Sequence, residues 1–190
     1  MTRRRTLLIL VPAIVAAMSA WGLFVALPRW HGGPATKAAA ATPPAPPPPG
    51  RKINARLFYV SDDGTRLNGV ERDVPFGEGA VEQAREIIDA QIAPVSEPLV
   101  SAVPPGTTLR TVFITSRGEA YVDLSQEVSM AHTGGTLNEL LTVYTLVHAL
   151  TANLPAVHSV QLLVDGKEVP TLAGHVDLRR PFARNLAWIQ

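Results

Sequence analysis

A run of 21 residues without a charge, Leu7 to Leu27, constrains this chain more than any other feature. At about 1.5 Å per residue, a helix of that length spans roughly 31 Å, enough to cross the hydrocarbon core of a bilayer. Arg3, Arg4 and Arg5 precede the run, whereas Arg29 and Lys37 follow it. This bias predicts one transmembrane helix over residues 7–27, with residues 1–6 in the cytoplasm and the remainder outside it.

Two alternatives to an uncleaved anchor are a cleaved signal peptide and an export signal of the twin-arginine type. Small residues at Ala17 and Ala20 offer cleavage sites, but the apolar core of a signal peptide is usually about 7–15 residues. Thr2-Arg3-Arg4 resembles a twin-arginine start without the rest of that motif. All these readings place the C-terminal part in the extracytoplasmic or periplasmic space, so we expect a single-pass protein of the bacterial cytoplasmic (inner) membrane.

Residues 28–52 are predicted to be a Pro/Ala-rich linker, with six prolines and one alanine in the run Pro43 to Pro49. Proline fixes φ and lacks a backbone donor, so this stretch favours an extended polyproline II spacer. A ligand for a proline-recognition module is the alternative.

Charge and cysteine content exclude several functions. All 16 acidic side chains lie in residues 53–190 beside ten basic ones, a net charge of −6, whereas residues 1–52 carry +7. An acidic globular part argues against nucleic acid as a partner, because phosphate binding needs clustered Lys and Arg. The chain has no cysteine, which excludes disulfides, thiolate zinc sites, cysteine nucleophiles and a lipidated cysteine.

The pattern of residues 53–190 predicts an α+β fold, a mostly antiparallel sheet with two helices on one face, preceded by the transmembrane helix. Alternating apolar residues predict strands over 53–60, 67–74, 109–115, 119–125 and 160–164. Asp165-Gly166 predicts a tight turn into a returning strand, Lys167 to Val169.

Two helices are expected, over residues 79–92 and 136–153. In the first, Val81, Ala84, Ile88 and Ile92 fall on one stripe. In the second, Thr136 and Glu139 have the spacing of a capping box. Its expected buried stripe consists of Leu137, Leu140, Leu141, Tyr144, Val147, His148 and Thr151.

An ordered set of short motifs carries a family resemblance over roughly residues 53–184. The motifs are Leu57-Phe58-Tyr59, Ile92-Ala93-Pro94, Ser101-Ala102-Val103-Pro104-Pro105-Gly106-Thr107, Ala120 to Ser125, Leu146 to Thr151, and Val160 to Gly166. In this order they resemble a GerMN domain, named from a sporulation and germination protein. The resemblance implies residues 53–190 as a GerMN-like domain, a fold similar to ring-building motif domains, and a non-enzymatic scaffold or interaction role. A single copy and the missing lipidated cysteine depart from many relatives.

Six residues are the candidates for chemistry: Asp123, Ser125, His148, Asp165, His175 and Asp177. No G-x-S-x-G, H-E-x-x-H, phosphate-loop or G-x-G-x-x-G motif accompanies them. We therefore expect no catalytic, cofactor-binding or metal-binding residue and no cofactor.

Each candidate has a structural reading. His148 is expected in the core, bonded to a backbone carbonyl or hydroxyl, and Asp165 in a turn. Asp123 and Tyr121 are expected to be solvated, and Asp62-Asp63 to form a turn. His175-Val176-Asp177 leaves a two-ligand metal site open, and Gly134-Gly135 leaves open an anion site at a helix start.

The expected function is a membrane-anchored, non-catalytic interaction or assembly module of the cell envelope. Its expected partners are envelope proteins or a second copy, the membrane through one helix, and peptidoglycan as a further candidate. The alternative is an envelope enzyme or small-ligand binder acting on or near peptidoglycan. The five histidines also suggest association that depends on pH.

Overall fold

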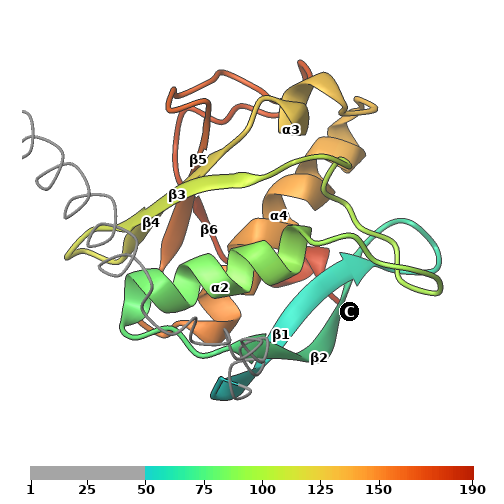
Figure 1. The fold of residues 1–190 in the computed structure, drawn as a ribbon. Coiled ribbons are helices and arrows are strands. Elements are labelled where there is room, and N and C mark those ends of the chain that lie inside the picture. Colours follow the sequence, from blue (N-terminus) through green and yellow to red (C-terminus); the bar gives the residue numbers. More distant parts are fainter. Residues whose placement is uncertain (1–49) are drawn as a thin grey trace, which may run out of the picture. The chain divides into compact units, whose positions relative to one another are not determined.

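The computed structural model describes residues 50–190, which form an α+β unit with two sheets (Figure 1). Sheet A is an antiparallel hairpin of β1 (Lys52–Val60) and β2 (Leu67–Pro75). Sheet B has the order β3 (Leu109–Ile114), β4 (Glu119–Leu124), β5 (Ser159–Val164), β6 (Phe182–Ala183). The predicted anchor and residues 28–49 of the predicted spacer lie outside the described residues. Lys52, predicted as the last residue of the spacer, is the first residue of β1. No helix within residues 50–190 has the length and apolar character that crossing a membrane requires.

The predicted α+β class and the mostly antiparallel pairing are confirmed, but the prediction of a single sheet is wrong. The strands divide into two sheets, and β4 pairs with β5 in parallel, from Glu119↔Ser159 to Leu124↔Val164. The reason is the helix α4 (Thr136–Asn153), which lies between these two strands in the chain. A helical crossover returns the chain to the same end of the sheet, which makes the next strand parallel.

The predicted strand after the Asp165-Gly166 turn is also wrong. The turn itself is confirmed, with φ values of 50° and 74° at these two residues. However, pairing stops after one bridge, Val164↔Lys167. The neighbour of β5 is instead β6, through Ser159↔Ala183 and Val160↔Phe182.

The helices α2 (Ala80–Ile92) and α4 agree with the predicted spans, whereas the short α3 (Glu127–Met130) was not predicted. Every residue from Leu141 to Leu150 is buried, because α4 contacts β1 in sheet A, β5 and β6 in sheet B, and α2. Over this span the helix therefore has no side that faces solvent. Leu137 and Val81, both expected on buried stripes, are exposed.

The last nine residues, 182–190, link the two sheets, and we call them the C-terminal strap. At one end β6 extends sheet B, and at the other Ile189 forms a parallel bridge with Leu67 of sheet A. Between them lies the 3₁₀ turn η1 (Leu186–Trp188), whose Trp188 ring stacks on Tyr144 of α4 at 5.7 Å. The strap therefore crosses α4 and contacts both sheets.

Candidate functional site

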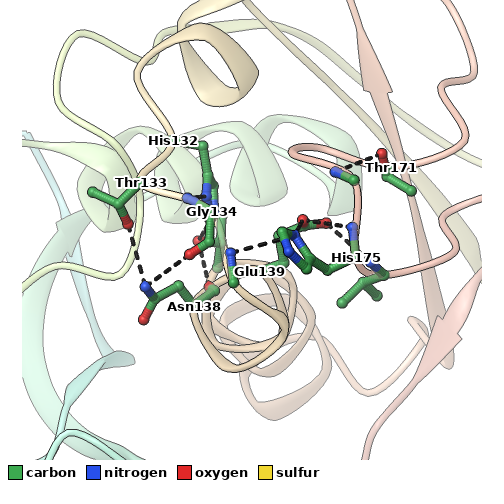
Figure 2. A network of polar contacts seen from close by, with 11 residues as sticks. His132, Thr133, Gly134, Asn138, Glu139, Thr171 and His175 are labelled. Carbon is green, nitrogen blue, oxygen red and sulfur yellow. Dashed lines mark hydrogen bonds and ion pairs between the residues drawn. The ribbon is translucent and has the colours of Figure 1, made fainter.

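A buried carboxylate at the start of α4 is the centre of the polar network in Figure 2. The Glu139 side chain is 0% exposed. Its Oε1 accepts hydrogen bonds from the backbone N of His175 at 2.9 Å and from His175 Nδ1 at 2.8 Å, and its Oε2 accepts from Val176 N at 3.1 Å. One side chain of α4 thus fixes the segment that precedes the strap.

This arrangement overturns the predicted capping box. The N-cap of α4 is Gly135, at φ 92°, and no side chain caps the helix there. Thr136 and Glu139 have the expected spacing, but Glu139 bonds a segment 36 residues further along the chain. Glycine suits the positive φ at the helix start, so the Gly134-Gly135 pair is confirmed as the turn into the helix.

Glu139 is charged despite its burial. Burial by itself would raise the pKa of this carboxyl, but hydrogen bonds from the His175 side chain and from the backbone of residues 173–176 outweigh it and lower the pKa. An ionised carboxylate only accepts, so the 2.8 Å contact places a proton on His175 Nδ1. Gly135 N also approaches Nδ1, at 3.3 Å, and the shorter, charged contact decides the tautomer.

His132 forms a second chain of hydrogen bonds beside the first. Gly134 N donates to His132 Nδ1 at 2.9 Å, so the proton of a neutral ring resides on Nε2. That proton is directed at Thr142 Oγ1, 3.1 Å away, whose hydroxyl in turn donates to Ala102 O at 2.6 Å. Burial lowers the pKa of His132, which agrees with a neutral ring. The chain connects α4 to the loop after α2.

A cavity of about 310 Å³ lies next to the hydrogen-bond chain of His132, Thr142 and Ala102. The end of β1, the loop of residues 100–105, the segment before α4 and α4 itself line it, including Val60, Val103, Pro104, His132, Asn138 and Leu141. Its lining is thus mostly apolar, with one imidazole, one side-chain amide and the two hydroxyl residues Ser101 and Thr133. Such a surface is suited to holding an apolar side chain or a small ligand.

The structure brings two of the six sequence candidates together, in a structural role. Asp123 Oδ1 accepts from Gly166 N at 2.7 Å, and its Oδ2 accepts from Arg110 Nε at 3.0 Å. The same arginine donates Nη1 to Asp165 at 3.1 Å. Asp123 is buried, so its expected solvation is wrong: the tight turn after β5 supplies a backbone donor that needs a buried acceptor.

The other four candidates lie in separate surroundings. His148 is buried in the core and its Nε2 lies 3.1 Å from Asn185 O, which confirms the predicted backbone contact. Ser125 Oγ accepts from Thr108 N at 3.0 Å. Two nitrogens of the Arg179 side chain bind Asp177 at 2.9 and 2.8 Å and lower its pKa to about 2. Within residues 50–190 no cluster of three or more metal-ligating side chains is found.

The Asp62-Asp63 turn is confirmed, with Asp63 Oδ1 accepting from Ser61 Oγ at 2.7 Å and from Thr65 N at 3.0 Å.

Sequence reasoning missed this set of two neighbouring contacts, Glu139 with His175 and His132 with Thr142. A partial signal was present: Glu139 is the only charged side chain of the predicted helix 136–153, which is otherwise rich in apolar residues. The present geometry gives this set a positioning role, since its lone pairs and protons are used inside the fold.

Residues 56–170 match the Germane family, described as sporulation and spore germination. The fold is similar to the crystal structure of a candidate lipoprotein from Clostridium perfringens, with 22% identity, TM-score 0.51, and coverage of 70% of this chain and 88% of that one. It is also similar to the tandem GerMN domains of the sporulation protein GerM from Bacillus subtilis, with 18% identity and TM-score 0.55.

That second match covers 70% of this chain and 47% of the tandem protein. No curated protein matches the chain. The matched segment, which holds both sheets' main strands, α2 and α4, is more than half of the sequence. The chain therefore belongs to the Germane family of sporulation and spore germination domains.

Proposed function

We propose that this protein is a membrane-anchored, extracytoplasmic module that binds or assembles envelope proteins and has no catalytic activity. The uncharged run Leu7 to Leu27 supports the anchor, and the proline-rich linker supports a spacer between the bilayer and the domain. Membership of the Germane family supports an envelope role.

The single observation that carries the non-catalytic part is the state of the Glu139–His175 pair. An acid and a histidine 2.8 Å apart have the composition of a proton-transfer pair. Here the carboxylate is fully buried and accepts three N–H groups of one neighbouring segment. A group held in this way positions backbone, because both of its oxygens accept from His175 and Val176.

The surface around the cavity is the part best suited to a partner. Val100, on its rim, is 55% exposed. Met130 and Leu137, which are 76% and 38% exposed, are the chain neighbours of the lining residues Ala131 and Asn138. Exposed apolar side chains on a concavity or on the segments that line it are a feature of binding surfaces.

Site-specific photo-crosslinking in intact cells tests the interaction. A photoreactive residue at Val100, Met130 or Leu137 is expected to give discrete adducts with envelope proteins. The same residue at Arg117, in the exposed turn between β3 and β4, is the matched control and is expected to give none. Equal adduct patterns at all four positions, or no adducts at any of them, would contradict the proposal.

The chain has no cysteine, so a single introduced cysteine can report on which side of the membrane the domain lies. A cysteine introduced at Arg117 of the full chain is expected to react with a membrane-impermeant maleimide in cells whose cytoplasm is sealed. A cysteine at Thr2 is expected to react only after lysis. Protection of the Arg117 position would place the domain in the cytoplasm and overturn the proposed topology.

A small-ligand binder acting near peptidoglycan is the second candidate, and the cavity of about 310 Å³ favours it. That volume falls at the lower end of small-molecule sites, about 300–1,000 Å³. If this candidate holds, soluble peptidoglycan fragments should raise the melting temperature of the full chain saturably, and Leu141→Trp, which fills the cavity, should abolish the shift. An unchanged melting temperature would rule out this second candidate and leave the interaction module as the remaining one.

A further inference from the structure

Within residues 50–190, sheet A consists of the two strands β1 and β2, and its two edges differ in what covers them. The edge of β1 is covered by side-chain amides. Asn153 of α4 accepts from Arg56 N at 2.9 Å and donates to Arg56 O at 2.8 Å. Gln91 of α2 does the same for Phe58, at 2.8 Å in both directions. Val60 N then donates to Val100 O at 2.8 Å. This edge cannot accept another strand.

The backbone hydrogen bonds at the two ends of the hairpin determine which groups of β2 point outward. Ser61 N donates to Arg66 O and Phe76 N donates to Arg51 O, so these are hydrogen-bonded pairs of the antiparallel ladder. Such pairs alternate with pairs whose backbone groups point away from the partner strand. The outward positions of β2 are therefore Leu67, Gly69, Glu71 and Asp73.

The outer edge of β2 is in use at one end and open along the rest. Leu67 O accepts from Gln190 N of the strap at 3.0 Å, next to the parallel bridge of Ile189. Within residues 50–190, the outward N–H and C=O groups of Gly69, Glu71 and Asp73 have no backbone partner. The residues Glu71 to Asp73 are exposed. The edge thus already pairs with one extended segment and offers six further groups over about 14 Å.

The charges along this edge select the kind of strand that fits. Glu71 and Asp73 lie on one face of the hairpin, the face on which their register partners Arg56 and Asn54 also lie, and Lys52 Nζ is 3.7 Å from Asp73. Basic β1 side chains therefore flank an acidic row on β2. A strand added beside β2 would place every second residue next to that row, where opposite charges stabilise and like charges destabilise.

The same rule argues against a second copy of this chain. If two β2 strands paired antiparallel through this edge, each outward-pointing residue would lie opposite an outward-pointing residue of the other copy. In the open part of the edge these residues are Gly69, Glu71 and Asp73. Glu71 would then face an acid or a glycine in every such register. We propose that the open edge of β2, Gly69 to Asp73, is a strand-addition site for an extended segment of a partner protein that carries Lys or Arg at alternate positions.

This inference rests on the proposed interaction function and names a surface and a partner chemistry for it. The probe is a capped heptapeptide with lysine at positions 2, 4 and 6 and valine or threonine between, labelled for fluorescence anisotropy. The full chain is held in zwitterionic phospholipid nanodiscs, and empty nanodiscs are the blank. A peptide with glutamate in place of lysine is the matched control. Saturable binding of the lysine peptide alone is the expected result.

Two variants separate backbone pairing from simple charge attraction. Glu71→Pro removes an outward N–H at an edge position that tolerates proline, and is expected to weaken binding by about tenfold or more. Glu71→Gln keeps that N–H and is expected to lose less. The double variant Glu71→Lys/Asp73→Lys is expected to bind the glutamate peptide in preference, a readout that does not depend on Glu71→Pro folding.

Binding of neither peptide, or binding that neither the proline nor the charge reversal alters, would overturn the strand-addition site. The crosslinks at Val100, Met130 and Leu137 give the separate readout for the proposed function. If those crosslinks form and persist in the double lysine variant while the peptides fail to bind, the interaction function stands without this site. If no crosslink forms but the lysine peptide binds, the edge is real and the cavity surface is not the partner site.

Discussion

The side-chain amide of Gln91 bonds Phe58 through both its oxygen and its nitrogen, each at 2.8 Å, and so occupies the place of a neighbouring strand. Gln91 is fully buried in α2, and Phe58 lies in the middle of β1. Asn153 of α4 repeats the contact two residues along the strand. Both helices thus protect one edge of sheet A with the same chemistry, and the stability of the domain should depend on it.

Gln91→Ala should lower the free energy of unfolding by about 2–5 kcal/mol, because two buried backbone groups of Phe58 lose their partners. Urea denaturation of the chain measures this. Glu82→Ala, at an exposed position in the same helix, is the control and should cost no more than about 1 kcal/mol. Similar losses in the two variants would show that the edge contact adds little.

Glu139→Gln should destabilise the domain by about 2–3 kcal/mol, because an amide nitrogen would face backbone donors that the carboxylate now satisfies. The loss should be local in its dynamics. Amide hydrogen exchange is expected to speed up at His175 and Val176, whereas exchange within β5 should stay slow.

Glu78→Gln, in the exposed segment before α2, makes the same chemical change without a buried partner and serves as the control. If exchange at His175 and Val176 is equally slow in both variants, Glu139 does not hold that segment.

Local sequence signals predicted the bounds of α4 well, but they did not predict the hydrogen-bond partners of its side chains. Gly134-Gly135 before the helix and Pro155 after it fixed the span 136–153, because glycine and proline act on their own neighbourhood. Glu139 matched a local motif as well, yet its partners are His175 and Val176, far along the chain. A buried polar residue satisfies whichever donor the tertiary fold supplies, and spacing does not contain that information.

In the sheets, too, the spans of strands were easier to predict than the pairing between strands. The spans of β1 and β2 could be predicted from alternation and from the turn at Asp62-Asp63. The predicted order of β4, α4 and β5 already favoured parallel pairing, because a helical crossover joins the two strands, and the antiparallel expectation did not use this signal. The replacement of the expected strand by β6 could not be predicted, because it depends on where the strap places a distant segment. The candidate site was missed for this reason, since it joins residues 102, 132, 139 and 175 from four segments.

Trp188→Ala should destabilise the chain by about 1–3 kcal/mol, because a partly buried indole that stacks on Tyr144 is replaced by a methyl group. Leu186→Ala in the same 3₁₀ turn is the matched control, because Leu186 is exposed and should cost less than about 0.5 kcal/mol. Thermal unfolding distinguishes the two. Equal melting temperatures for both variants would mean that the strap does not stabilise the sheets it crosses.

The stability of the domain should fall as the pH drops from about 6.5 to about 4, and His148 should be the main cause. Burial lowers the pKa of His148 from 6.5 to about 4, with the Asn185 carbonyl acting in the opposite direction. Between about pH 6.5 and about 4, this histidine binds a proton in the unfolded chain but not in the folded chain. The stabilisation is therefore complete above about pH 6.5 and is lost as the pH falls toward about 4. At about 1.4 kcal/mol per unit, the loss amounts to about 3 kcal/mol.

His148→Gln should remove most of the pH dependence of the unfolding free energy between about pH 6.5 and about 5, at the cost of lower stability at neutral pH, where the ring packs between Phe58 and Tyr144. Closer to pH 4, the lowered pKa of Glu139 should leave a slope of the same sign. Burial also lowers the pKa of His132, which should leave a smaller residual slope of the same sign. His158→Gln, at an exposed position, should retain the full slope. Urea titrations at several pH values give the comparison, and a steep slope that survives in His148→Gln would assign the pH dependence to another group.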